Sequence, residues 1–259
     1  MLLTVLGCSG SVPAATSPAS GYLVRADGAS VVLDLGNGAF GALQRYVDPF
    51  SVDGLVLSHL HPDHCADVCA MAVYRRYHPC ASGHGPLPLY GPSDAAERLI
   101  AAYAPNAAER RATHLADVYS FRSYRDVVRI GPFEVRAAPV EHPCEAYALR
   151  LHHAGKALVF SGDTGPCRQL VELAAGADVL LAEASWTYRP SNPPGVHMSG
   201  KDAGEAAAAA GVGRLLITHV PPWTDRDQVL AEAQAAFSGP TELVCPDAHY
   251  DLWRDIRRL

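Results

Sequence analysis

The densest group of potential metal ligands in the sequence follows a short apolar stretch, residues 55–57. His59, His61, Asp63 and His64 lie within six positions there. In an extended turn His59 and His61 point the same way, while Asp63 and His64 begin a helix and project to a neighbouring point. Neutral imidazoles together with a carboxylate suit zinc and other first-row ions. The spacing therefore predicts a site that can hold two adjacent metal ions.

These side chains must be positioned by strands and helices, which the hydrophobic pattern predicts. Short apolar runs of strand length recur along both halves of the chain, separated by alanine-rich segments of helical character. The expected strands are residues 2–6, 22–25, 31–33, 55–57, 133–137, 147–151, 157–160, 179–181 and 215–218. The expected helices are residues 94–103, 169–175, 202–210 and 227–237. The pattern indicates a mixed α/β protein, and its two similar sets of elements allow a two-layered sheet core with helices outside it.

Capping pairs and turn residues refine this outline. Ser199 with Asp202, and Thr224 with Asp227, have the spacing of capping boxes and predict helix starts. Residues 79–92, which contain two Gly-Pro pairs, are interpreted as a surface loop. No Ser/Gly-rich or Pro-rich linker divides the chain, so residues 1–259 are expected to form one domain.

Composition limits the functional classes. The 259 residues include 21 Lys and Arg against 27 Asp and Glu, a formal net charge of -6. This balance argues against a nucleic-acid binder without excluding a small phosphate-bearing substrate. No apolar run approaches the roughly 20 residues that a membrane span needs. Seven Cys, an odd number with no CxxC pair, indicate reduced thiols and a cytoplasmic location.

The HxHxDH run at residues 59–64 resembles the signature of the metallo-β-lactamase fold superfamily. That resemblance implies an αββα sandwich with a two-metal site at one edge of the sheets. It also implies three further ligands at the ends of later strands, and the sequence offers His142, Asp163 and His219. One divalent ion would then be bound by His59, His61 and His142. The other would be bound by Asp63, His64 and His219, with Asp163 bridging the two.

Further runs resemble the ribonuclease Z-like branch of that superfamily, whose members cleave phosphodiesters. They are residues 7–11 (GCSGS), 182–185 (AEAS) and 197–199 (HMS). The resemblance implies that Glu183 and His197 form a pair beside the metals. His197, kept cationic by Glu183, would protonate the leaving oxygen. Asp63 would orient the attacking hydroxide besides binding a metal.

The segment between two expected ligands bears on the size of the substrate. Transfer-RNA-processing members of the branch carry a long substrate-gripping insertion between the ligands that match His142 and Asp163. Here these residues are only 21 positions apart and are joined by two expected strands. Because this leaves no room for such an arm, and because the net charge is acidic, a small substrate is favoured over RNA.

A finer resemblance, spread over nearly the whole chain, is to the actinobacterial atypical class II cyclic-nucleotide phosphodiesterases. It rests on residues 7–11, 17–22 (SPASGY), 90–94 (YGPSD), 183–187 (EASWT) and 218–224 (THVPPWT). It implies hydrolysis of 3',5'-cyclic AMP or another cyclic nucleotide to the nucleoside 5'-monophosphate, with two divalent ions, zinc or manganese. Many relatives dimerise, so the resemblance also allows a homodimer.

Three alternatives stay open at this level. The first is a ribonuclease or general phosphodiesterase, the second a thioesterase or lactonase of the same fold, and the third a non-catalytic metal-binding regulatory protein. The third is disfavoured because degenerate members of the superfamily usually lose ligands, whereas all seven are present here. Trp186, Tyr188 and Trp223 lie near Glu183 and His219 in the sequence, and could either stack on a base or act as packing anchors.

Overall fold

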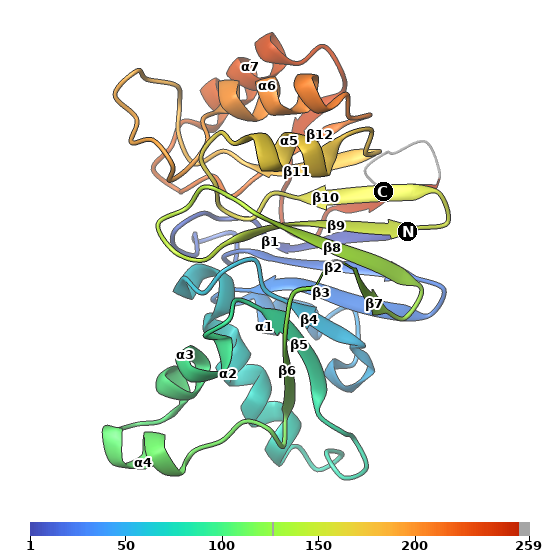
Figure 1. The fold of residues 1–259 in the computed structure, drawn as a ribbon, viewed down its shortest axis with the longest axis vertical. Coiled ribbons are helices and arrows are strands. Elements are labelled where there is room, and N and C mark those ends of the chain that lie inside the picture. Colours follow the sequence, from blue (N-terminus) through green and yellow to red (C-terminus); the bar gives the residue numbers. More distant parts are fainter. Residues whose placement is uncertain (126, 254–259) are drawn as a thin grey trace.

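The computed structural model describes residues 1–125 and 127–253, and in them two seven-stranded sheets pack face to face (Figure 1). In spatial order the first sheet contains β14 (His249–Asp251), β1 (Leu2–Gly7), β2 (Gly21–Ala26), β3 (Ala29–Leu35), β4 (Gly54–Val56), β5 (Leu87–Gly91) and β6 (Tyr119–Ser123). The second contains β13 (Thr241–Leu243), β12 (Leu215–Thr218), β11 (Val179–Glu183), β10 (Lys156–Phe160), β9 (Tyr147–His153), β8 (Phe133–Pro139) and β7 (Val128–Ile130).

Helices cover the outer face of each sheet. The first sheet carries α1 (Ala39–Leu43), a 3-10 turn (Pro49–Ser51), α2 (Pro62–Tyr77), α3 (Ala95–Tyr103) and α4 (Ala107–Ala112). The second carries α5 (Arg168–Ala174), α6 (Gly200–Ala210) and α7 (Arg226–Ala236). Figure 1 shows these two groups on opposite sides of the paired sheets, which confirms the predicted αββα sandwich. Within the described ranges, no helix combines the length and apolar character needed to cross a bilayer.

Alternation along the strands divides the apolar side chains among three buried groups. Val24 and Leu158 belong to the core between the two sheets. Their neighbours Leu23 and Val159 point to the opposite faces, where they pack in the cores under the first and second helical layers. Both faces of each sheet are therefore packed against apolar side chains. The loops at the sheet edges are where polar side chains can gather.

One of the two predicted capping boxes is confirmed. The Ser199 hydroxyl accepts a hydrogen bond from the backbone N–H of Asp202, whose carboxylate accepts in turn from the Ser199 backbone N–H at 2.9 Å. The prediction at Thr224 is wrong, because Asp225 caps α7 instead. The Thr224 hydroxyl donates to the backbone carbonyl of Ser185 at 2.9 Å, a tertiary contact that local spacing does not reveal.

The predicted loop at residues 79–92 is wrong in its second half, where β5 lies. The first Gly-Pro pair precedes β5 and the second lies at its end, and Leu87, Leu89 and Tyr90 are buried in a strand that pairs in parallel with both β4 and β6. A central parallel strand is buried on both faces and therefore reads as a short apolar run rather than as an alternating one. The short elements β6, β7, β13, β14, α1 and α4 also lay outside the expected set.

Candidate metal centre

The seven predicted ligands come together at one edge of the sandwich. The neighbouring strands β10, β11 and β12 run in parallel, so their carboxyl ends meet at this edge. Asp163 follows β10, His219 follows β12, and His142 lies in the loop after β8. The run at residues 59–64 connects β4 to the first turn of α2. The donor atoms form two groups, each within 4.8 Å internally: His59, His61 and His142; and Asp63, His64, Asp163 and His219.

In the first group three imidazole nitrogens converge. His61 Nδ1 lies 3.0 Å from His59 Nε2 and 3.1 Å from His142 Nε2. His59 is fully buried, and its burial together with nearby His64 holds its pKa well below the usual value, so the ring is neutral. Burial also lowers the pKa of His61 and of His142. Three neutral imidazoles around one point are a donor set that suits zinc or a similar ion.

In the second group a carboxylate stands between histidines. Asp163 Oδ1 lies 3.1 Å from His64 Nε2 and 3.4 Å from His219 Nε2, while its Oδ2 lies 3.8 Å from His59 of the first group. Asp63 Oδ2 lies 3.0 Å from His219 Nε2. Asp163 therefore spans both groups, as its expected bridging role requires.

Charge and burial around Asp163 fit a cation. Its Oδ1 is buried and accepts no hydrogen bond from the residues that the structure describes. Burial alone would raise the pKa of Asp163, but His219 and His64 outweigh it and hold the pKa well below the usual value. Burial lowers the pKa of His64, whereas Asp163 and Asp34 raise it to a larger extent. The negative charge of these carboxylates also attracts a divalent ion. The charge and the donor types therefore fit the two metals expected of the superfamily.

Four of the candidate ligand histidines share one hydrogen-bonding arrangement. The Nδ1–H of each ring donates to a neighbouring oxygen, which leaves Nε2 as the lone-pair donor facing the cluster. The pairs are His59 with Ser58 Oγ (3.1 Å), His64 with Asp34 Oδ2 (2.7 Å), His142 with the Val196 carbonyl (2.9 Å) and His219 with Ser185 Oγ (2.9 Å). The neighbouring residues thus orient each ring, and they favour the form in which Nε2 can bind a metal ion.

Asp34 is the supporting residue that sequence reasoning missed. It lies in β3, is fully buried, and accepts hydrogen bonds from the Ser58 backbone N–H and hydroxyl at 2.7 Å each, besides that from His64. One carboxylate therefore ties β3 both to the residue before His59 and to His64. The signal available in the sequence was a lone acidic residue that follows directly on the apolar run at residues 31–33.

The backbone near the ligands is tightly packed. His219 has a φ of +55°, in the left-handed region, and a Cβ on Gly10 would lie 2.3 Å from its carbonyl oxygen. Gly162, next to Asp163, has a φ of +58° and would place a Cβ 2.8 Å from both the Ser58 Cβ and the Tyr147 carbonyl. Gly162 therefore lets the backbone beside Asp163 pass close to Ser58 and Tyr147.

Glu183 and His197 form the expected pair beside the cluster. Glu183 is fully buried at the end of β11, and its Oε1 accepts from His197 Nδ1 at 2.8 Å. The same carboxylate accepts from the backbone N–H groups of Thr164 and Ser185 at 3.0 Å each. Burial alone would lower the pKa of His197, but Glu183 and then Asp163 raise it to about 9. His197 Nδ1 lies 3.8 Å from Asp163 Oδ2, so this cationic ring borders the metal centre.

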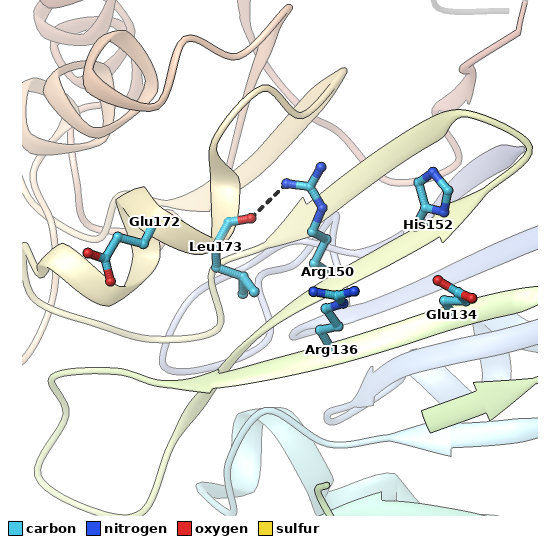
Figure 2. Close-up of a pocket in the computed structure, with 6 residues that line it drawn as sticks. All are labelled: Glu134, Arg136, Arg150, His152, Glu172 and Leu173. Carbon is cyan, nitrogen blue, oxygen red and sulfur yellow. Dashed lines mark hydrogen bonds between the residues drawn. The ribbon is translucent and has the colours of Figure 1, made fainter. Parts of the chain in front are cut away.

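A separate hollow of about 380 Å³ lies over β8 and β9, and Figure 2 shows the residues that line it. Arg136 and Arg150 face each other in the strand register, and Arg150 donates to the Leu173 carbonyl at 2.8 Å. None of the seven ligands lines this hollow. It is therefore distinct from the metal centre.

Comparison with known proteins agrees with this geometry. Residues 18–220 match the family described as the beta-lactamase superfamily domain. Together with the two-sheet sandwich and its cluster of seven donors, the match defines a metal-dependent hydrolase. The chain belongs to the metallo-β-lactamase superfamily.

Individual relatives extend over most of the chain. A ribonuclease Z of Mycolicibacterium gilvum is 33% identical over 243 residues, which cover 85% of this chain and 84% of that protein. An uncharacterized protein of Mycobacterium leprae is 50% identical over 254 residues, 96% of this chain and 88% of that protein. The crystal structure of the metallo-β-lactamase fold protein YhfI from Bacillus subtilis has a TM-score of 0.83 at 26% identity and covers 96% of this chain and 98% of its own. The resemblance to the ribonuclease Z branch is confirmed.

Proposed function

We propose that this hydrolase cleaves a small phosphodiester, 3',5'-cyclic AMP or another cyclic nucleotide, and releases the nucleoside 5'-monophosphate. The observation that carries the proposal is the hydrogen-bonded Glu183–His197 pair, which places a protonated imidazole 3.8 Å from Asp163 of the metal cluster. Such a ring can protonate an alkoxide leaving group, the difficult departure in phosphodiester hydrolysis.

The cofactor is proposed to be two divalent ions, zinc or manganese. They would be held by His59, His61 and His142 on one side, by Asp63, His64 and His219 on the other, and by Asp163 between them. Bound there, two ions supply Lewis-acid stabilisation of the phosphoryl oxygens and lower the pKa of a water molecule towards neutrality. The mixed imidazole and carboxylate donors suit both proposed metals.

Three side chains of the chain would supply the proton, hold its donor in place and orient the attacking water. Glu183 fixes the His197 ring through Nδ1 and keeps it protonated. As a water oxygen attacks phosphorus and releases its proton to solvent, the bond from phosphorus to the 3' oxygen breaks and His197 gives its proton to that leaving oxygen. Asp63, whose pKa is held low by hydrogen bonds from His219 and His64 that outweigh its burial, stays ionised and orients the attacking water.

Two features support a small substrate. The segment between His142 and Asp163 is occupied by β9 and β10, which pair as a hairpin with His153 opposite Lys156, so no arm for gripping RNA projects from it. The net charge of -6 also disfavours binding to a polyanion. We therefore propose no nucleic-acid partner. The name of the Mycolicibacterium gilvum relative favours ribonuclease activity as the second candidate.

The proposal is tested by comparing substrates on metal-free protein reconstituted with zinc or with manganese. A panel of 3',5'-cyclic nucleotides is assayed beside bis(p-nitrophenyl) phosphate and a precursor tRNA with a 3' extension. We expect turnover of cyclic AMP that is lost in Asp163→Asn and kept in His152→Ala, a histidine on β9 outside the cluster. Cleavage of the precursor tRNA without cyclic-nucleotide turnover would instead establish the ribonuclease.

A further inference from the structure

A second hollow, of about 610 Å³, is lined in part by Trp186, whose ring contacts that of His197. It lies between the loop that follows β11 and the segment that follows His219 and leads into α7. Trp186 and Trp223 contribute to its walls, one from each segment. The Thr224 hydroxyl donates to the Ser185 carbonyl at 2.9 Å and so fixes the two segments to each other.

Trp186 is the residue that the hollow shares with the proposed acid. Its ring meets the His197 ring edge to face, with centroids 5.2 Å apart and an interplanar angle of 86°. Its backbone also pairs with Ser199, just beyond His197. A group bound in the hollow beside Trp186 would therefore lie near the His197 ring.

Trp223 is exposed in an unusual way for so large an apolar side chain. The residue retains 68% of its accessible surface, and it lies four positions after the ligand His219. An indole left uncovered in a concavity offers a flat face on which an aromatic ring can stack. The alternative from sequence, a packing anchor, does not suit a side chain that is mostly in solvent.

Two amide side chains in the lining of the hollow, Asn192 and Gln228, offer acceptors. The Asn192 side-chain amide donates to the Thr187 carbonyl at 3.0 Å, and that of Gln228 donates to Glu232 at 3.0 Å. The carbonyl oxygen of each amide is then left to accept a hydrogen bond. Arg189, also on the wall, makes no ion pair within the described part of the chain and can donate to ring nitrogens.

We infer that this hollow is the base-binding subsite, that Trp223 stacks on a purine, and that the Asn192 and Gln228 oxygens select a base with an exocyclic amino group. The inference rests on the proposed function, because it supplies the part of the substrate that the metal centre does not contact. Adenine meets both requirements, an aromatic face and an amino donor. Hypoxanthine has the same ring system with a carbonyl in place of that amino group.

The test compares the metal-loaded wild type with Trp223→Ala on three substrates: cyclic AMP, cyclic IMP and 1-O-methylribose 3',5'-cyclic phosphate, which has no base. We expect Trp223→Ala to raise KM for cyclic AMP by roughly 10-fold, the size of one lost base stack, with kcat and metal content unchanged. KM for the base-free substrate should not change. The wild type should prefer cyclic AMP to cyclic IMP.

Two matched variants accompany this comparison. Trp223→Phe retains a stacking face and should restore most of the affinity. Tyr188→Ala removes another exposed aromatic residue from the loop after β11, one that does not line this hollow, and should behave as wild type. An unchanged KM for cyclic AMP in Trp223→Ala, or an equal rise for the base-free substrate, overturns the inference.

Binding of adenosine 5'-monophosphate, followed by quenching of indole fluorescence, separates this inference from the proposed function. If the wild type turned over no cyclic nucleotide, the proposed function would fall. Saturable quenching in the wild type that is weakened in Trp223→Ala would still support a base subsite. Absence of quenching in the wild type would overturn it.

Discussion

His197 Nδ1 donates a hydrogen bond to Glu183 Oε1 at 2.8 Å, and the same nitrogen lies 3.8 Å from Asp163 Oδ2. One ring thus touches a buried carboxylate on the sheet and borders the proposed metal bridge. This contact joins the acid–base pair to the metal cluster. Because His197 is not one of the seven candidate ligands, substitution can test its role in the reaction apart from metal binding.

Removing the imidazole should impair chemistry and spare the metals. We expect His197→Ala to lower kcat for cyclic AMP by roughly 100- to 10,000-fold, the range for loss of a general acid. Metal content, measured by mass spectrometry of the purified protein, should stay at two ions because His197 is not among the seven ligands. His152→Ala is the control. A variant with wild-type kcat would remove His197 from the mechanism.

Glu183→Gln should change the pH profile. Glu183 is the main group that raises the pKa of His197 to about 9 against the effect of burial. Without that carboxylate the pKa falls. Because the acid must be protonated to act, activity is lost as pH rises through this pKa, so the alkaline limb of the kcat profile should move to lower pH. Measurement of kcat in steps from pH 6 to 10 checks this, and a limb in the wild-type position contradicts it.

Metal removal should destabilise the folded protein. Each ion bound only by the native state stabilises it by RT ln(1 + [L]/Kd), about 2.7 kcal/mol per site at a hundredfold excess over Kd. For two sites in a chain of this length we expect chelation to lower Tm by roughly 10–20 °C. Scanning calorimetry with and without chelator measures the shift, and added zinc should reverse it. In Asp163→Asn, chelation should produce a much smaller shift.

Asp34→Asn tests the support of a ligand from outside the cluster. The carboxylate holds His64 Nδ1 at 2.7 Å and also accepts two hydrogen bonds from Ser58. Loss of such an outer partner typically costs 10- to 100-fold in metal affinity, so we expect about that weakening in a competitive chelator titration. Asp53→Asn is a matched control, since Asp53 accepts from the Ser30 backbone N–H, away from the ligands. Equal affinity in both variants would show that Asp34 has no such role.

The HxHxDH run was predictable because its chemistry is local. The end of β4 and the start of α2 are only a few residues apart, and they place His59, His61, Asp63 and His64. Spacing alone therefore predicts two neighbouring groups of donors. His142, Asp163 and His219 came from the resemblance to a known superfamily. Their convergence depends on three strands ending at one edge, which spacing along the chain does not express.

The errors have the same physical origin. Thr224 was expected to cap α7, but its hydroxyl is used by the Ser185 carbonyl across the fold. The two Gly-Pro pairs around β5 favoured a loop in the local pattern. Residues 87–91 form a strand because they pair with β4 on one side and β6 on the other. In each case a tertiary partner decided the outcome over the local pattern.

The sequence by itself determined the mixed α/β class and the HxHxDH run, because strand periodicity and motif spacing are properties of neighbouring residues. The three later candidate ligands and the Glu183–His197 pair came from the resemblance to a known superfamily. Only the tertiary structure decided that Asp34 supports His64 and that Trp186 and Trp223 share a hollow beside His197. Trp186 and Trp223 are 37 positions apart, and Asp34 and His64 are 30 apart. Their contacts arise from packing of sheets and loops, which brings together side chains that no local rule relates.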